Sequence, residues 1–501
     1  MFAGEGILVN FGSVKRTKGG IFLSFVHKCI VCFSLMVLSS ELFASFPKYI
    51  FYFIGDGMGH AHVELAEKYS LATGRGGLAI NSFTLKRSIT THPFTSELVT
   101  DSAAAGTALA CGVKTRIGML GVDAATNPVP SCAAIAKEKG MKVGIIATVM
   151  TTHATPAAFY AHQSRRSRDY EIAIELVHSG FDYFAGGGLG GRYDDKKSKQ
   201  YMKYGNAYDY AESAGYKIIR TRDEFLALKS GDGKVLTRFT DGHLTGEIDV
   251  RLPRTQPTLA EMVSKGIELL DGPQGFFIMA EGSRIDWSCH SNDAKSMVLD
   301  VLGMDDAVKV ALEFSRKHPD ETLIVVVADH ETGGLTLREG DAAGAENLRL
   351  LDCQKISMNL FSKQFVRLLE KKRSLKFDDV KNMITEFYGF KFAGDCTADK
   401  TVLSAEETNG LEKAFEQDKA TCQAKVKENT GYMDRKHYVF SSILCRLLNG
   451  RAGVCWKSSS HTGCRVPLIV HGCKSEAFAG NSDNTDVGIT LKRIVQKEVG
   501  R

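Results

Sequence analysis

The run Leu323-Ile324-Val325-Val326-Val327-Ala328-Asp329-His330 places two polar residues directly after an apolar, β-branched stretch. A continuous apolar run of this kind is typical of a strand buried on both faces, as in a parallel sheet covered by helices. A buried strand seldom ends in two such polar groups unless they are hydrogen-bonded or bind a ligand. The run therefore predicts a central strand with a functional site at its carboxyl end.

Other apolar runs have the same character and are separated by helical segments. Amphipathic patterns at residues 170–179 and 304–314 are typical of such helices. We therefore expect an α/β fold with a largely parallel central sheet flanked by helices on both faces. The further predicted strands are residues 49–54, 142–147, 276–280 and 466–470.

Polar side chains also follow the other predicted strands. In a parallel sheet the carboxyl ends of the strands meet at one edge, so these groups are expected to lie close together. Oxygen and imidazole ligands without thiolates suit a catalytic zinc site with an open coordination position. The residues concerned are Asp56, His153, Thr155, Glu281 and Asp286, together with Asp329 and His330.

Asp286 and His290 are four residues apart. If the chain is helical from Ile285 onward, both side chains share one face and can bind one metal ion. The alternative is an ordinary stabilising pair on a helix surface. The spacing alone leaves both interpretations open.

The run Thr100-Asp101-Ser102-Ala103-Ala104-Ala105-Gly106 predicts a helix of small residues with a hydroxyl group at its start. The first N–H groups of a helix lack intrahelical partners and, with the positive end of the helix dipole, stabilise a bound anion. The alternative is that Asp101 or Ser102 is an ordinary helix cap. This segment by itself does not decide between the two.

Composition limits the classes of function. With 501 residues, 44% of them hydrophobic, the chain can bury a large core in one domain with insertions or in two to three units. A net charge of +5 and only two tryptophans provide neither a polybasic surface nor a stacking platform. We expect a small-molecule substrate and no nucleic acid as a specific partner.

The N-terminus has the pattern of an export signal. Basic residues up to Lys28 precede the apolar stretch 29–38, and Ala44 offers a small residue for cleavage. We predict that residues 1–44 are a signal peptide and that the protein is periplasmic or extracellular. An uncleaved anchor is the alternative, but the apolar run is short for a bilayer, and no other run suggests a stable membrane span.

Two insertions interrupt the predicted α/β core, which comprises residues 45–338 and 456–501. Residues 186–252, which begin with a glycine-rich run, are expected to form a mobile elaboration of the sheet's edge. Residues 339–455 are expected to form a mostly helical subdomain near the site. Its predicted helices are 354–370, 376–388, 404–427 and 437–448.

Six of the twelve cysteines lie from Cys396 onward. In an oxidising compartment this clustering predicts local disulfides in the C-terminal third, although spacing does not determine the pairing.

Six motifs together resemble those of alkaline phosphatases, in that family's chain order. The resemblance extends from Lys48 to about Gly472 and implies metal-dependent hydrolysis of phosphate monoesters to an alcohol and inorganic phosphate through a phosphoserine. The motifs are FIGDGMG at 53–59, TDSAAAGT at 100–107, HATP at 153–156, EGSRID at 281–286, ADHETGG at 328–334 and SHTG at 460–463.

Carried over residue by residue, the resemblance implies that Ser102 is the nucleophile and a metal ligand. It implies a first zinc ion at Asp286, His290 and His461. It implies a second zinc ion at Asp56, Asp329 and His330. A magnesium ion would be held by Glu281 and Thr155, with Asp56 bridging toward it.

Three further positions are assigned to the substrate by the same resemblance. Arg166 matches the family's phosphate clamp, and a guanidinium group can bind two phosphate oxygens at once. Arg165 and Arg168 lie nearby in sequence and are the alternatives for this role. His153 stands where some members have aspartate; it either binds zinc at the third site or lies beside the ligands of that site without binding the ion. Trp287 stands where some members have lysine and either stacks near the substrate or packs in the core.

Other functions remain as alternatives. One alternative is a phosphodiesterase or sulfatase of the same superfamily. Arg166 argues against a phosphodiesterase, and the absence of a Cys-x-Pro-x-Arg run argues against a sulfatase. A catalytically silent binding protein would lack the intact ligand set. The resemblance also suggests a homodimer. The remaining histidines considered, interpreted as structural, are His60, His62, His92, His162, His178 and His318.

Overall fold

The computed structural model describes residues 46–95, 98–190, 193–250, 253–372, 374–427 and 438–497. The predicted signal peptide, residues 1–44, lies outside these ranges. No helix in the described part of the chain is both long and apolar enough to cross a bilayer.

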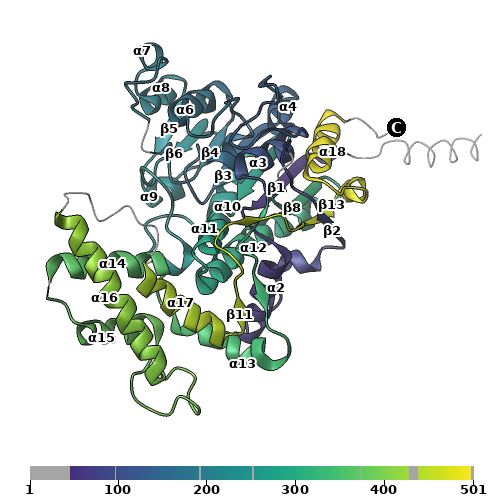
Figure 1. Cartoon of the computed structure of the whole chain (residues 1–501). Helices are drawn as coiled ribbons and strands as arrows, with labels where there is room; N and C mark the ends of the chain where they lie inside the picture. Colours follow the sequence, from purple (N-terminus) through teal and green to yellow (C-terminus); the bar gives the residue numbers. More distant parts are fainter. Residues whose placement is uncertain are drawn as a thin grey trace, which may run out of the picture. The chain divides into compact units, whose positions relative to one another are not determined.

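A nine-stranded sheet forms the centre of the described structure, in the order β2-β13-β8-β1-β7-β3-β4-β6-β5 (Figure 1). All neighbouring strands are parallel except β13, which runs antiparallel to both β8 and β2. This confirms the predicted largely parallel sheet. The strands are β1 Tyr49–Gly55, β2 Leu85–Ile89, β3 Lys142–Ala147, β4 Tyr183–Ala185, β5 Tyr216–Ile219, β6 Lys234–Thr237, β7 Phe276–Glu281, β8 Thr322–Ala328 and β13 Val466–Gly472.

Every residue of the central strands β1, β7 and β8 is buried, as their continuous apolar sequences predict. Successive side chains point to opposite faces of the sheet. On one face the Phe51 ring lies 5.7 Å from that of Phe314, in helix α12 (Ala294–Lys317). On the other face the Tyr52 hydroxyl donates to the carbonyl of Leu109, in helix α3 (Ser102–Cys111). Helices therefore cover both faces.

Further helices complete the two layers. Helix α10 (Leu259–Leu270) packs beside α12, and α18 (Asn484–Gln496) packs on α3 and on α4 (Cys132–Glu138). The predicted helix at 170–179 is α6 (Asp169–His178). The predicted helix at 304–314 is one part of the longer α12. That helix begins earlier, at Ala294, where the Asp293 side chain caps its start by accepting from the Ser296 N–H.

The described part of residues 186–252 contributes two strands at one edge of the sheet. Strand β6 pairs with β4, and β5 pairs with β6, both in parallel. Helices α7 (Tyr201–Tyr204), α8 (Ala207–Ser213) and α9 (Arg222–Leu226) connect these strands.

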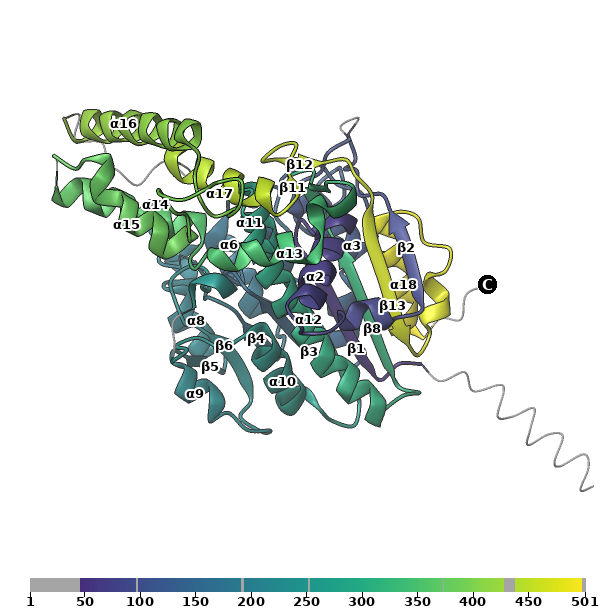
Figure 2. The same ribbon diagram turned by 90° about the horizontal axis from the view of Figure 1, so that it is seen from below.

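The described part of residues 339–455 contains the short helix α13 (Ala345–Leu348) and four longer helices. The longer ones are α14 (Met358–Lys371), α15 (Phe377–Tyr388), α16 (Ala405–Lys427) and α17 (Val439–Arg451), close to the predicted ranges. Figure 2 shows α14, α15 and α16 side by side. Their shared interior is aromatic: the ring of Phe440 lies 4.9 Å from that of Phe365 and 5.9 Å from that of Phe415.

The predicted disulfides of the C-terminal third are wrong for Cys396, Cys445, Cys455 and Cys464, which form none. Cys445 is buried with its sulfur 3.2 Å from the Tyr388 hydroxyl, whereas Cys396 and Cys464 are exposed. Closeness in sequence does not satisfy the short Cβ separation that a disulfide requires.

We expect Phe51→Ala to lower the free energy of unfolding by about 3–5 kcal/mol, because the fully buried ring would leave a cavity between Phe276 and Phe314. Urea unfolding followed by circular dichroism measures this change. Met202→Ala, at a side chain that is 93% exposed, is the control and should change the free energy by less than about 0.5 kcal/mol. Equal stability of the two variants would contradict the packing described.

Candidate active site

The carboxyl ends of the central strands bring the predicted site residues together. Asp56 directly follows β1, Glu281 ends β7, and Asp329 and His330 directly follow β8. His461 comes from a distant part of the chain. It is placed by β12 (His461–Thr462), which pairs antiparallel with β9 (Glu331–Thr332) next to His330.

The first cluster contains Asp286, His290 and His461, whose donor atoms lie close enough together to hold one metal ion. Helix α11 (Arg284–His290) puts Asp286 and His290 on one face, with His290 Nε2 at 3.2 Å from Asp286 Oδ2. His290 Nε2 also lies 3.2 Å from His461 Nε2. The chain is helical here, which meets the condition under which Asp286 and His290 share one face.

Backbone carbonyls orient the two imidazoles of this cluster. His290 Nδ1 lies 2.6 Å from the carbonyl oxygen of Ser459, and His461 Nδ1 lies 2.9 Å from that of Thr100. A histidine that donates from Nδ1 to a carbonyl keeps Nε2 unprotonated, which is the form that binds a metal ion. Both Nε2 atoms therefore converge on Asp286.

The second cluster contains Asp56, Asp329 and His330, all fully buried. His330 Nε2 lies 3.4 Å from Asp56 Oδ1 and 3.3 Å from Asp329 Oδ2. Asp329 Oδ1 accepts the backbone N–H groups of Gly57 and His330, so only Oδ2 faces the cluster.

The third cluster contains Asp56, His153 and Glu281. Asp56 belongs to both this cluster and the second, so it can bridge two ions. The Thr155 hydroxyl and the Ser283 hydroxyl are also buried here. The sequence interpretation missed Ser283, although it lies within the EGSRID motif.

Several oxygens of the second and third clusters are buried without a hydrogen-bond partner among the described residues. They are both carboxylate oxygens of Asp56 and of Glu281, Asp329 Oδ2, and the hydroxyl oxygens of Thr155 and Ser283. Unpaired buried carboxylates are costly, and a bound divalent cation removes that cost. The donor set therefore fits metal ions.

The pKa values of these groups show the same imbalance of charge. Burial, together with the neighbouring carboxylates, raises the pKa values of Asp56 and Asp329 well above their usual range, and burial raises that of Glu281 to about 7. Burial lowers the pKa of His330 well below its usual range. Asp286 differs: burial acts to raise its pKa, but the hydrogen bond from His290 and the nearby imidazoles lower it overall.

Ser102 is the first residue of α3 and is 97% buried, with its Oγ 3.3 Å from His330 Nε2. The helix cap is Asp101, whose Oδ1 accepts the N–H of Ala104 at 3.0 Å. Of the two open interpretations, capping therefore falls to Asp101, and the Ser102 hydroxyl is left at the metal-ligand cluster.

Arg166 also reaches this end of α3. Its Nη1 donates to Asp101 Oδ2 at 3.1 Å, and its Nη2 lies 3.2 Å from His153 Nε2. Burial, and the adjacent Arg166 charge, lower the pKa of His153 to about 3, so this imidazole is neutral. The neighbouring arginines Arg165 and Arg168 are exposed.

Two residues that sequence reasoning missed support the site. The Thr332 hydroxyl donates to Asp286 Oδ1 at 2.6 Å, and it lies inside the ADHETGG motif. His243 comes from the edge segment, and its ring centroid lies 4.2 Å from that of Trp287. Trp287 itself borders the third cluster, 6.4 Å from the ring of His153. No motif marks His243 in the sequence.

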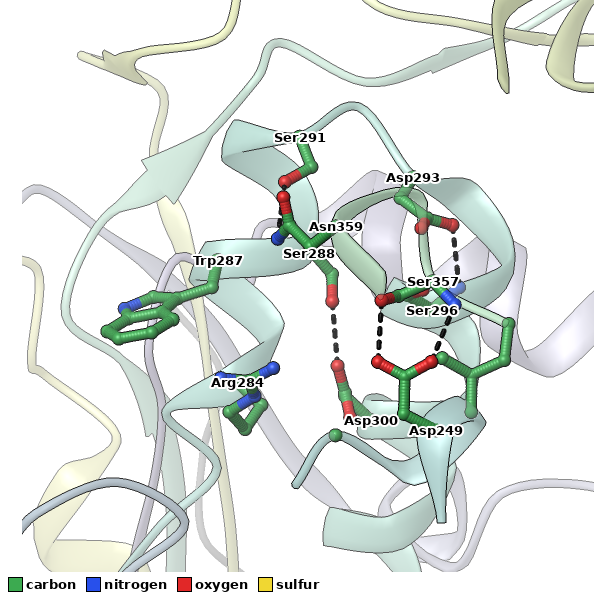
Figure 3. Close-up of a pocket in the computed structure, with 12 residues that line it drawn as sticks. Asp249, Arg284, Trp287, Ser288, Ser291, Asp293, Ser296, Asp300, Ser357 and Asn359 are labelled. Atoms are coloured by element: carbon green, nitrogen blue, oxygen red, sulfur yellow. Dashed lines mark hydrogen bonds between the residues drawn. The ribbon is translucent and has the colours of Figure 1, made fainter. Parts of the chain in front are cut away.

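A small cavity of about 10 Å³ lies behind α11 and is lined in part by Trp287, Ser288 and Asp300 (Figure 3). Its carboxylates have partners: Ser288 donates to Asp300 at 2.7 Å, and Ser357 donates to Asp249 at 2.6 Å. A cavity of this size has room for about one water molecule. It lies between α11 and the start of α14. It is distinct from the three metal-ligand clusters.

Comparison with known proteins agrees with this geometry. The family model described as alkaline phosphatase matches residues 47–497. Alkaline phosphatase 4 of Bacillus subtilis is 31% identical over 458 residues, which cover 88% of this chain and 87% of that relative.

Solved structures of alkaline phosphatases share the fold. The cold-active enzyme of Shewanella sp. is 26% identical, with a TM-score of 0.72, and the match covers 89% of this chain and 99% of that one. The Thermus thermophilus enzyme is also 26% identical, with a TM-score of 0.72, covering 91% and 92% of the two chains. The chain therefore belongs to the alkaline phosphatase family, and it is a phosphoric monoester hydrolase.

Proposed function

We propose that this enzyme hydrolyses phosphate monoesters in two steps through a phosphoserine at Ser102. The observation that carries the proposal is the set of buried, unpartnered carboxylate oxygens on Asp56, Asp329 and Glu281 beside the Ser102 hydroxyl. A hydroxyl next to a site of this kind is a suitable nucleophile for phosphoryl transfer.

The residues divide among three ions. Asp286, His290 and His461 would hold the first zinc ion. Asp56, Asp329 and His330, with the Ser102 oxygen, would hold the second. Glu281 and Thr155, together with Asp56, would hold magnesium at the third site, or zinc if His153 contributes. When bound, the ions supply positive charge that favours the deprotonated nucleophile and neutralises the leaving oxygen.

In the first step Ser102 Oγ forms a bond to phosphorus while the bond to the ester oxygen breaks, and the alcohol leaves with a proton. In the second step water attacks the phosphoserine, which releases inorganic phosphate and restores the Ser102 hydroxyl. Ser102 sits at the first turn of α3, where free backbone N–H groups and the helix dipole favour the phosphoryl anion.

Arg166 binds the phosphoryl oxygens in both steps. The hydrogen bond from Arg166 to Asp101 holds its guanidinium group near Ser102 and next to His153. A terminal phosphate has the free oxygens that a guanidinium fork requires, which favours monoesters over diesters. His153 and Trp287 form the adjoining wall of the substrate site.

Family membership also bears on the location and the oligomeric state of the protein. We infer that the protein is exported, to the periplasm or outside the cell, and that it forms a homodimer. The division into a split α/β core and an inserted helical subdomain also remains a prediction.

Ser102→Ala should reduce kcat by at least about 10³-fold, because it removes the attacking oxygen. Rates on an aryl phosphate measure this, and mass spectrometry of acid-quenched wild-type enzyme should find one phosphoryl group on the Ser102 peptide. Ser131→Ala is the matched control, since Ser131 caps helix α4. It should lose about 1 kcal/mol of stability but keep kcat. Retention of turnover in Ser102→Ala would overturn the proposal.

Removal of metal ions by a chelator should abolish activity and lower the unfolding temperature, because it leaves the buried carboxylates uncompensated. Metal analysis of the loaded wild type should give two zinc ions and one magnesium ion, and Asp329→Asn should lose zinc. The matched control is Asp300→Asn, a buried carboxylate outside the three clusters, which should keep all three ions. Full activity after chelation is the contrary result.

Arg166→Ala should weaken inhibition by inorganic phosphate at least about tenfold, because a charged hydrogen-bond donor to the phosphoryl group is lost. Arg168→Ala, at an exposed neighbouring arginine, should not change it. Initial rates on a monoester, a diester and a sulfate ester should show the monoester strongly preferred by the wild type and the preference reduced in Arg166→Ala. A preference for the diester or the sulfate ester would favour the alternative enzymes.

A further inference from the structure

The loop at residues 240–243 of the edge segment reaches the wall of the active site through His243. Its ring lies 4.2 Å from that of Trp287 at an angle of 68°, an edge-to-face arrangement. The guanidinium group of Arg284 lies 5.0 Å from the same indole. Trp287 is therefore in contact with two side chains that the catalytic steps do not use.

The backbone around His243 is held tightly in place. The Thr240 N–H donates to the Gly187 carbonyl at 2.8 Å. Gly187 leaves no room for a side chain, because a Cβ there would lie 2.0 Å from the Gly242 oxygen. The Met150 N–H donates to His243 Nδ1 at 3.4 Å, which links the loop to the segment leading into His153. The glycine-rich run thus allows the close approach that places this imidazole.

The Trp287 indole, which His243 contacts, lies beside the residues proposed to border the bound phosphate. Trp287 follows Asp286 of the first cluster, and its ring lies 6.4 Å from that of His153. His153 in turn lies 3.2 Å from the Arg166 guanidinium group. A shift of the indole therefore changes the space beside the two side chains that border the phosphoryl group.

We propose that His243 is a positioning residue that fixes the Trp287 indole beside His153 and thereby sets the affinity of the enzyme for the phosphoryl group. This role rests on the proposed function of the site, in particular on phosphate binding at Arg166. The contact that carries this role is between the His243 imidazole and the Trp287 indole. Burial and the Arg284 charge lower the pKa of His243 to about 4, so the imidazole is neutral at the pH of catalysis.

The chain has two tryptophans, so a Trp456→Phe background leaves Trp287 as the single fluorescent indole. In that background, His243→Ala should raise both the KM for an aryl phosphate and the inhibition constant of inorganic phosphate by about 3- to 10-fold, with kcat within about twofold. The Trp287 emission should shift to longer wavelength, and its response to added inorganic phosphate should shrink. His243→Phe, which keeps an aromatic edge, should restore the parent values.

His243→Asn separates the ring contact from the hydrogen bond to Met150, because the amide keeps an acceptor and loses the ring. We expect it to behave like His243→Ala. Normal KM in His243→Asn together with impaired His243→Phe would overturn the proposal, as would unchanged emission and KM in His243→Ala. His178→Ala is the control for losing an imidazole that contacts aromatic rings: His178, on α6, lies edge-to-face with Tyr204 and Tyr210. This variant should not alter KM.

Failure of this proposal is distinguishable from failure of the proposed function. If His243→Ala leaves KM unchanged while Ser102→Ala is inactive, only the positioning role is rejected. Persistent turnover of Ser102→Ala would reject the phosphoserine mechanism, whatever the fluorescence of Trp287. Urea unfolding of each His243 variant ensures that a change in KM is not partial unfolding.

Discussion

The concentration of negative charge at the carboxyl edge of the sheet is the constraint on which the rest of the structure depends. Asp56, Glu281 and Asp329 are fully buried at the ends of neighbouring strands, and most of their oxygens have no hydrogen-bond donor among the described residues. Such a group of carboxylates stays ionised at neutral pH at little cost only when cations are bound, and the neighbouring imidazoles complete donor sets for them. The fold therefore carries a site that metal binding stabilises.

The hydrogen bonds around this edge orient the donors. Carbonyls fix the rings of His290 and His461, and backbone N–H groups occupy one oxygen of Asp329. Asp101 caps α3 and also holds Arg166, so one carboxylate positions both the helix that begins at Ser102 and the proposed phosphate clamp. Ser102, the proposed nucleophile, is therefore not needed as the cap of α3.

Much of the fold and site could be predicted because the signals are local. Apolar runs specify the central strands, and the polar residue after each run marks the same edge of the sheet. Features that depend on distant contacts escaped prediction. Cys396, Cys445, Cys455 and Cys464 form no disulfide, since their sulfurs lie in different surroundings. His243 lies in an insertion without a motif, and only the packing of its loop against Gly187 brings it to Trp287.

The parallel α/β class, the family and the candidate metal-ligand side chains could be read from the chain alone, because strand periodicity and motif order are properties of the sequence. The choice of the carboxylate that caps α3, the approach of His461 to His290 and the contact of an edge loop with Trp287 became visible only in the folded structure. Those outcomes depend on distances between residues far apart in the chain. Such distances are set when the strands and helices pack together.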